Sequence, residues 1–208
     1  MWIFMIDILS YLGGLKNDVT LLYGKAGTGK TTLALQTAVA IAKQKKKVFF
    51  LDTEGGFVLE RFRQICGEHW LDVLDYVVVM KAKNFLEQTD RVASMFPLID
   101  KFGMIIVDTI GNLYRKEVQQ DPLTINRLMD KQLHVLFELS KKVPVLLTNQ
   151  VYSDMTRQQQ VVSVGGNMIL KWCQRVVELQ KDPRELLMHK PDKKKALFRI
   201  VDSGILLS

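Results

Sequence analysis

The chain has 208 residues, of which 48% are hydrophobic and 25% are charged, and this ordinary composition provides one substantial core. We therefore expect a single domain over residues 1–208. The net charge of +7 and the pI near 9.4 favour an anionic partner such as nucleic acid or a nucleotide.

The cysteines argue against a disulfide-bonded or zinc-binding protein, and the N-terminal segment argues against a membrane span. Cys66 and Cys173 lie far apart without a Cys-x-x-Cys pattern, which argues against a disulfide framework or a zinc site and fits a reducing cytoplasm. Residues 1–6 are apolar, are interrupted by Asp7 and are too short to span a membrane. We expect this segment to pack on the core or to contact another subunit, and we expect no membrane partner.

Strand-like apolar runs alternate with helical patterns over the first 150 residues. Asn84 and Asp121 are expected helix caps, and Pro97 is expected to kink or shorten its helix. This rhythm predicts an α/β fold with a mainly parallel central sheet flanked by helices. In chain order the predicted elements are strand 19–23, helix 30–43, strand 47–51, helix 56–66, strand 76–80, helix 84–101, strand 104–107, helix 121–142 and strand 143–147.

The last third has a different pattern. Short strands are predicted at 175–180, 185–189 and 197–201 without helices between them, and turns are predicted around Pro183 and Pro191. We therefore expect C-terminal antiparallel strands, in a β-hairpin region over residues 175–208.

A phosphate-binding loop lies between strand 19–23 and helix 30–43. Glycines in such a loop let backbone N–H groups converge on phosphate oxygens, and the following helix N-terminus adds partial positive charge. Lys30 is expected to reach the β- and γ-phosphates of ATP, and the Thr31 hydroxyl is expected to ligate Mg²⁺. The full set of nucleotide-binding candidates here is Gly24, Lys25, Ala26, Gly27, Thr28, Gly29, Lys30, Thr31 and Thr32.

Polar residues follow three other predicted strands. Asp108 ends the apolar strand 104–107, as a Walker B aspartate should, and is a metal candidate; a capping role is the alternative. Glu54 follows strand 47–51 and is the candidate general base, although Asp52 could exchange roles with it. Gln150 follows strand 143–147 and could sense the γ-phosphate.

Together these motifs resemble the RecA-like recombinase family, and within it the archaeal RadB branch, which has a bare ATPase core. The resemblance covers about residues 7–205 and rests on Gly24–Thr32, residues 52–57, residues 106–109 and residues 148–151. It implies that Glu54 is the catalytic glutamate and that Gln150 couples the γ-phosphate to a DNA-binding loop. It also implies that Arg61 stacks on adenine; a surface helix charge is the alternative.

The family also implies two DNA-facing loops. The first is expected around residues 114–116, where Arg115 and Lys116 could pair with phosphates, and the second over residues 152–166, which contains Arg157. Tyr114 or Tyr152 could stack on bases; a solvated loop is the alternative for each residue.

Three further groups of positively charged side chains lie outside the motifs described above. Lys190 is the better candidate, and His189 the weaker one, for a cation that reaches the γ-phosphate bound to a neighbouring subunit. The lysine-rich runs 43–47 and 193–195 are interpreted as solvated faces that add to the basic field.

We therefore expect an ATPase that uses ATP and Mg²⁺, binds DNA, preferably single-stranded, and assists homologous recombination beside a recombinase partner. The alternatives are a KaiC-like regulatory ATPase acting on protein partners, and a binding module in which ATP is structural. The sequence has no helix–hairpin–helix domain and no Phe-x-x-Ala linker, so the resemblance implies neither filament formation nor strand exchange. A homo-oligomer is possible, and slow turnover is predicted for the isolated chain because trans-acting cations would be missing.

Overall fold

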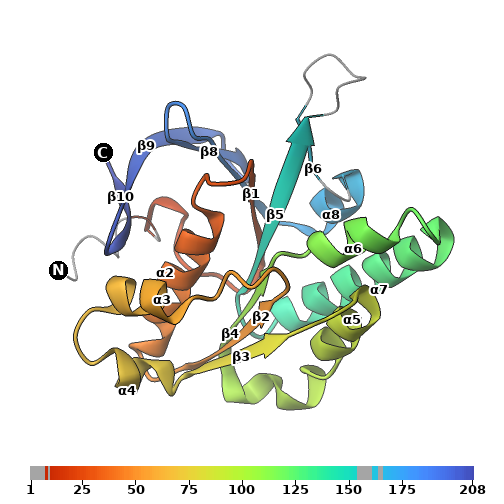
Figure 1. Ribbon diagram of the computed structural model, residues 1–208, viewed down its shortest axis with the longest axis horizontal. Coiled ribbons are helices and arrows are strands. Elements are labelled where there is room, and N and C mark those ends of the chain that lie inside the picture. The colour runs from red at the N-terminus through yellow and green to blue at the C-terminus, as the bar shows by residue number, and fades with distance from the viewer. Residues whose placement is uncertain (1–7, 9, 154–160, 164–165) are drawn as a thin grey trace.

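A ten-stranded sheet organises the chain in this computed structural model, which describes residues 8, 10–153, 161–163 and 166–208 (Figure 1). The strands lie in the order β10-β9-β8-β7-β1-β5-β4-β2-β3, and β6 pairs with β5 beside this path. The strands are β1 (Val19–Gly24), β2 (Lys47–Asp52), β3 (Val77–Lys81), β4 (Phe102–Asp108), β5 (Val145–Ser153), β6 (Val161–Ser163), β7 (Arg175–Leu179), β8 (Glu185–Lys190), β9 (Lys194–Val201) and β10 (Gly204–Leu207). The helices are α2 (Lys30–Ala42), α3 (Leu59–Cys66), α4 (Trp70–Leu74), α5 (Phe85–Ala93), the 3₁₀ helix η1 (Phe96–Lys101), α6 (Asn112–Glu117), α7 (Pro122–Ser140) and α8 (Gly166–Trp172).

The central strands are parallel, as the alternating pattern predicts. Strand β1 pairs in parallel with β5 and β7, and β4 pairs in parallel with β2 and β5. The register places Gly24 beside Gln150 and Asp52 beside Asp108. The polar residues that follow the predicted strands therefore meet at the carboxyl edge of the sheet.

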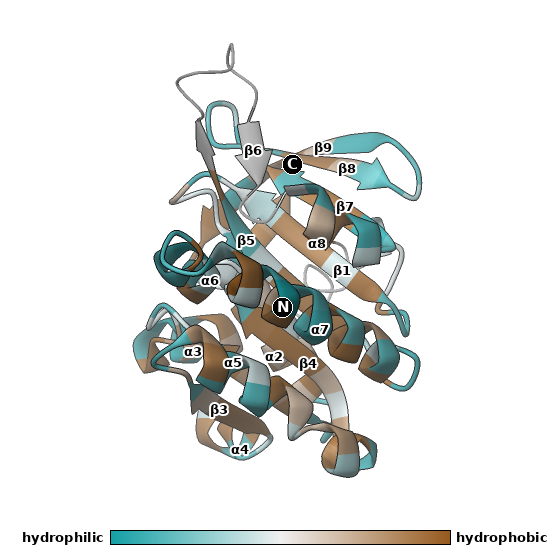
Figure 2. Cartoon of the chain, turned by 90° about the vertical axis from the view of Figure 1, so that its right-hand side faces the viewer, coloured by the Kyte–Doolittle hydropathy of each residue, from teal (hydrophilic) through white to brown (hydrophobic). Residues whose placement is uncertain are grey.

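Two apolar layers cover the two faces of this sheet. Alternate strand residues such as Leu22 and Phe50 pack in the layer that contains α2 and α3, whereas Leu21 and Phe49 pack in the layer that contains α5 and α7. In Figure 2, β1 and β4 are largely brown, whereas the helices carry both brown and teal, as expected for strands covered on both faces and helices covered on one. Strands buried on both faces read as continuous apolar runs, which is why the sequence locates them well.

Two predicted helices differ from those observed. The predicted helix 84–101 is divided into α5 and η1, and Pro97 lies at the start of η1. Its expected cap is confirmed, because Asn84 accepts a hydrogen bond from the Glu87 backbone N–H at 2.8 Å. The predicted helix 56–66 begins only at Leu59, since the preceding backbone is bound to Asp52.

The C-terminal strands are antiparallel, as predicted, and β8, β9 and β10 extend the sheet from β7. Strands β6 and β10 and the short helices α4, α6 and α8 are additional to the sequence prediction, and β6 lies within the region predicted as the second DNA-facing loop, residues 152–166. The region predicted as a DNA-facing loop around residues 114–116 is helical, because it belongs to α6. No helix in the described part of the chain has the length and apolar character needed to cross a membrane.

Candidate nucleotide-binding site

The phosphate-binding loop connects β1 to α2 and depends on two glycines. Gly29 precedes α2 with φ of 106°, a left-handed conformation that favours glycine. A Cβ on Gly24 would lie 2.3 Å from the Leu179 carbonyl oxygen, so the backbone of β7 approaches too closely for any side chain. These two positions fix the start of α2, whose first N–H groups face the loop.

Lys30 is the first residue of α2, and its side chain is buried against this loop. Its Nζ donates hydrogen bonds to the carbonyl oxygens of Gly24 and Lys25, at 2.9 and 2.8 Å, and 6% of the residue is exposed. Burial lowers the pKa of Lys30, and the negative charges of Asp108 and Glu54 oppose this shift. The loop therefore holds a cation next to two carboxylates, in the position expected for a phosphate-binding lysine.

Asp108 and Thr31 form the candidate magnesium site. Asp108 is 1% exposed and accepts hydrogen bonds from the hydroxyl groups of Thr148 and Thr31. Burial raises the pKa of Asp108, and these hydrogen bonds oppose the shift. A Cβ on Gly56 would lie 3.1 Å from Asp108 Oδ2 and 3.2 Å from Thr31 Cγ2, so the glycine keeps space open beside both residues.

The oxygen donors at this point fit Mg²⁺. Thr31 and Asp108 supply a hydroxyl and a carboxylate, and a phosphate chain held by the loop would supply further oxygens. Among the residues that the structure describes, no group of three or more His, Cys, Asp or Glu side chains could hold a metal by itself. The donor set therefore fits a metal that arrives with a nucleotide.

Glu54 and Asp52 have different surroundings, which separates their roles. Asp52 is 2% exposed, and its carboxylate accepts hydrogen bonds from four successive backbone N–H groups, those of residues 54–57. Glu54 is exposed at the carboxyl edge and accepts a hydrogen bond from the Thr109 hydroxyl at 2.9 Å. Asp52 therefore shapes the turn, and Glu54 is the carboxylate that can meet a water molecule.

Glu54 also contacts Gln150, which lies in β5. The Gln150 amide Nε2 is 3.0 Å from Glu54 Oε2 and 3.3 Å from Oε1. The two residues are 96 positions apart, and the parallel register brings them together at the edge next to Gly24. Beyond Gln150, β5 continues to Ser153 and pairs with β6. Glu54, the candidate base, is thus hydrogen-bonded to the strand that precedes residues 154–160.

Arg61 lies beside the end of β9. Its guanidinium donates to the carbonyl oxygens of Val201 and Asp202, at 2.8 and 3.2 Å. The end of β9 also approaches the phosphate loop, because a Cβ on Gly29 would be 2.9 Å from Ile200 Cδ1. Arg61 is thus held on the same side of the loop as the C-terminal strands, where its plane could cover a nucleotide base.

The candidate trans-acting residues have partners within this chain. Lys190 Nζ donates to the Leu170 carbonyl oxygen at 2.9 Å, near the end of α8. His189 Nε2 lies 3.1 Å from Glu178 Oε2, and its ring stacks on Tyr23 with centroids 6.0 Å apart. Either residue would have to leave these contacts to reach another subunit.

The candidate DNA-contacting residues are separated by the structure. Arg115 and Lys116 lie in the last turn of α6, and Arg115 is exposed. Tyr114 is buried against Phe85 and donates to Asn126 Oδ1 at 2.7 Å, so the expected stacking of its ring on bases is wrong. Arg157 and the side chain of Tyr152 lie outside the described residues.

Sequence reasoning missed one cation at the loop. Arg184, in the turn between β7 and β8, directs Nη1 toward the carbonyl oxygens of Gly27 and Thr28 at 3.4 and 3.5 Å. Its only sequence signal is its place after Pro183 in a predicted turn. The pairing of β7 with both β1 and β8 creates this proximity, and no local pattern encodes it.

The glycine-rich loop, the buried Lys30, Asp108 and the exposed Glu54 lie at one edge of a parallel sheet, the arrangement expected of a RecA-like P-loop site. The family model described as Rad51 matches residues 5–205, and the chain belongs to that family, whose members are ATPases.

Named relatives agree with this family. The "DNA repair and recombination protein RadB" of Methanobrevibacter smithii is 32% identical, over 97% of this chain and 92% of the relative. The protein of the same name from Methanocaldococcus jannaschii is 30% identical, over 91% of this chain and 93% of the relative. A solved structure, "Crystal structure of the RadB recombinase", has a TM-score of 0.77 and 29% identity, and covers 95% of this chain and 94% of its own. The RecA-like fold expected from the sequence is confirmed.

Proposed function

We propose that this protein binds DNA under the control of ATP, hydrolyses ATP slowly, and assists homologous recombination. Similar proteins that carry the name "DNA repair and recombination protein RadB" support the biological role. The nucleotide site supports the chemistry. The contact between Glu54 and Gln150 is the observation that carries the proposal, because it joins the hydrolytic site to the strand that enters the candidate DNA loop.

The chain's own residues would carry out hydrolysis as follows. Lys30 and the N-terminus of α2 bind the β- and γ-phosphates, and Arg61 covers the base. Thr31 and Asp108 would hold Mg²⁺, which supplies positive charge to the phosphate oxygens. Glu54 orients a water molecule and accepts its proton, as a general base does. Thr109 fixes one carboxylate oxygen of Glu54 for this task.

Gln150 would report the state of the nucleotide. A γ-phosphate close to Glu54 competes for the Gln150 amide, which can donate to only a few acceptors at once. Exchange of this hydrogen bond would shift β5 and, with it, the paired strand β6. Allosteric coupling of this kind amounts to a free-energy difference between two states of one element, typically about 1–3 kcal/mol.

The DNA partner would be bound mainly through its phosphates. Arg115, Lys116 and Arg157 are the candidate cations, with single-stranded DNA as the expected form. Turnover would remain slow in the isolated chain until a recombinase partner or a second copy supplied a further cation, and Lys190 is the candidate for such a group. We place this activity in the cytoplasm, together with the DNA.

The direct test measures anisotropy of a labelled single-stranded oligonucleotide at low salt, with a non-hydrolysable ATP analogue, with ADP, and without nucleotide. We expect tighter binding with the analogue, and loss of that response in Lys30→Ala. Lys131→Ala is the matched control, because Lys131 is an exposed lysine of α7 that lies outside the phosphate-binding loop. No binding under any of the three conditions would refute the DNA part of the proposal.

A further inference from the structure

An open groove lies at the amino edge of the sheet, opposite the nucleotide site. It has a volume of about 1180 Å³ and is lined by the turns that precede β1, β2, β4 and β5. The arrow of β5 in Figure 1 points away from this edge. The groove therefore shares no residue with the phosphate loop or with Glu54.

Five lysines line this groove and come from three separate turns. Among the residues that the structure describes, Asp100 is the only acidic residue in the lining, and it pairs with Lys142 at 2.9 Å. The other four ammonium groups have no acidic partner within the described residues, and all four residues are exposed. The lysines are Lys45, Lys46, Lys47, Lys101 and Lys142.

Helix termini account for only part of this charge. Cations are often found in the last turn of a helix, where they compensate the partial negative charge of the carbonyl groups. Helix α2 ends at Ala42 and α7 ends at Ser140, and neither has a basic residue in its last turn, whereas Lys101 lies in the last turn of η1. Lys45 lies at the α2 terminus, since its backbone N–H donates to the Ala42 carbonyl oxygen at 2.9 Å, and Lys46 and Lys47 lie beyond that terminus.

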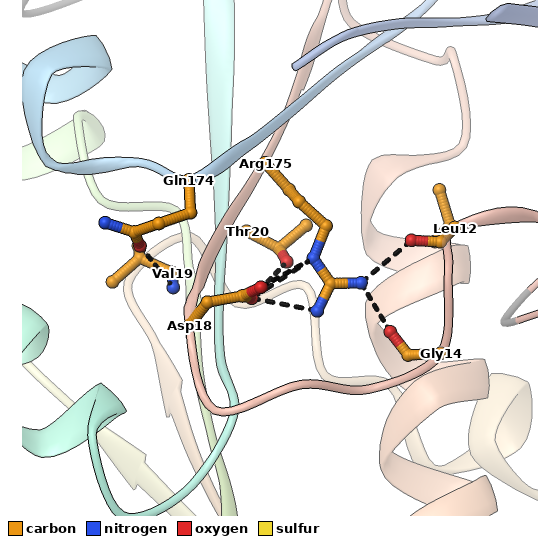
Figure 3. A network of polar contacts seen from close by, with 7 residues as sticks. All are labelled: Leu12, Gly14, Asp18, Val19, Thr20, Gln174 and Arg175. Carbon is orange, nitrogen blue, oxygen red and sulfur yellow. Dashed lines mark hydrogen bonds and ion pairs between the residues drawn. The ribbon is translucent and has the colours of Figure 1, made fainter. Parts of the chain in front are cut away.

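The groove has a fixed wall. Arg175, with only 6% of its side chain exposed, pairs with Asp18 at 2.9 Å and donates to the carbonyl oxygens of Leu12 and Gly14 (Figure 3). Asn17 Nδ2 donates to the Lys142 carbonyl oxygen at 2.9 Å and joins this wall to the end of α7. The segment 12–18 is thus bound at several points.

The floor of the groove, formed by the backbone of β4, supports the side chain of Lys46. A Cβ on Gly103 would lie 2.7 Å from Lys46 Cβ and 3.2 Å from its Cδ, so the stem of Lys46 lies directly on the backbone of β4. The apolar stem is supported while the ammonium group remains in solvent. Separately, Phe102 and Tyr76 supply half-buried aromatic surface to the lining.

We propose that this amino-edge groove binds the sugar-phosphate backbone of nucleic acid as a second contact surface, independent of the nucleotide state. Unpaired lysines spread over several turns suit a ligand with repeated negative charges, since each phosphate releases counterions when a cation neutralises it. A small anion would need donors converging in an enclosed pocket, and this groove is open. The proposal rests on the proposed function for the identity of the nucleic acid as DNA.

The test compares two variants with the same loss of charge. One carries Lys45→Ala, Lys46→Ala, Lys47→Ala and Lys101→Ala; the control carries Lys83→Ala, Lys131→Ala, Lys181→Ala and Lys193→Ala, all at exposed sites elsewhere. The readout is the slope of log affinity against log salt for single-stranded DNA, the form expected under the proposed function. The groove variant is expected to lower this slope by about 3, because each lost phosphate contact on a single strand removes about 0.7. The control is expected to change it by less than about 1.

Three outcomes are decisive. Equal slopes for the two variants, with the wild-type protein still binding DNA, would overturn the groove proposal alone. A wild-type protein that binds no DNA would overturn the proposed function and this inference together. Binding of polyglutamate that needs the same four lysines, with an unchanged DNA slope, would assign the groove to an acidic protein and overturn our proposal.

Single substitutions at one position guard against misfolding and test independence from nucleotide. Lys46→Glu should weaken DNA binding several-fold, whereas Lys46→Arg should retain it, since the charge is kept. Both effects should be the same with the ATP analogue and without nucleotide. An effect of Lys46→Glu that appears only with the analogue would contradict a second, independent surface.

Discussion

The two edges of the sheet use charge in opposite ways. At the carboxyl edge Asp108 and Lys30 are nearly inaccessible, and each is surrounded by hydrogen-bond partners from the loop or from neighbouring strands. At the amino edge Lys45, Lys46 and Lys47 are exposed and have no acidic partner within the described residues. Buried charges serve chemistry that needs fixed geometry, whereas exposed charges suit a ligand that is recognised by its charge density alone.

The largest effect is expected from Glu54→Gln. The amide keeps the size of the side chain and one acceptor oxygen for Thr109 but cannot accept a proton from water. Steady-state hydrolysis should fall about 10²–10⁴-fold, the usual contribution of a general base, while affinity for the ATP analogue should stay nearly constant. Glu60→Gln, on the exposed start of α3, is the matched control. A fall of less than about tenfold would remove Glu54 from the role of base.

The amino edge also contains one buried ion pair, between Arg175 and Asp18, and Arg175→Met tests its contribution to stability. Removing the guanidinium leaves Asp18 unpaired, which should cost about 3–5 kcal/mol in the free energy of unfolding measured with urea. The double variant Arg175→Met with Asp18→Leu should recover part of this loss, because the unpaired charge is gone. A loss below about 1 kcal/mol in the single variant would show that the wall of the groove does not depend on this pair.

Asp108→Asn should stabilise the nucleotide-free protein. Burial raises the pKa of Asp108, so the folded state holds the proton more tightly than the unfolded state does, and stability is lost as pH rises through the folded pKa. The asparagine variant lacks this loss, so its advantage should grow with pH and vanish in acid. At neutral pH we expect thermal unfolding to give a higher Tm for Asp108→Asn than for the wild-type protein. An equal or lower Tm across the pH range would contradict this account.

Lys142→Ala should have the smallest effect on stability. The side chains of Lys142 and Asp100 are 57% and 83% exposed, so solvent screens their ion pair. The free energy of unfolding should change by less than about 0.5 kcal/mol, measured with urea. A larger loss would mean that the amino edge depends on its surface charges for folding as well as for binding.

The sequence predicted which polar residues meet at the carboxyl edge of the sheet, because the required information is local. Each strand of the parallel sheet is an apolar run, and a polar residue directly after it must lie at the carboxyl edge. Asp52, Asp108 and Gln150 are all placed by this rule. The distinction between Asp52 and Glu54 was left open, because it depends on which carboxylate turns back to bind residues 54–57.

Features that depend on long-range pairing were not predictable from local pattern. Arg175 and Asp18 are separated by 157 positions, and nothing around either residue indicates the pair. The interpretation of residues 43–47 as a solvated face did not anticipate that the turn before β4 and the end of α7 bring Lys101 and Lys142 to the same groove. Tyr114 was misjudged because the short helix α6 turns its ring into the core.

The most direct test of the central claim is the coupling between nucleotide and DNA in Gln150→Ala. The ratio of DNA affinities with the ATP analogue and with ADP should be about fivefold or more in the wild-type protein, at the lower end of typical allosteric coupling. In Gln150→Ala we expect a ratio close to one, with affinity for the analogue nearly unchanged. A variant that keeps the wild-type ratio would contradict the claim that the Glu54–Gln150 contact links the two sites.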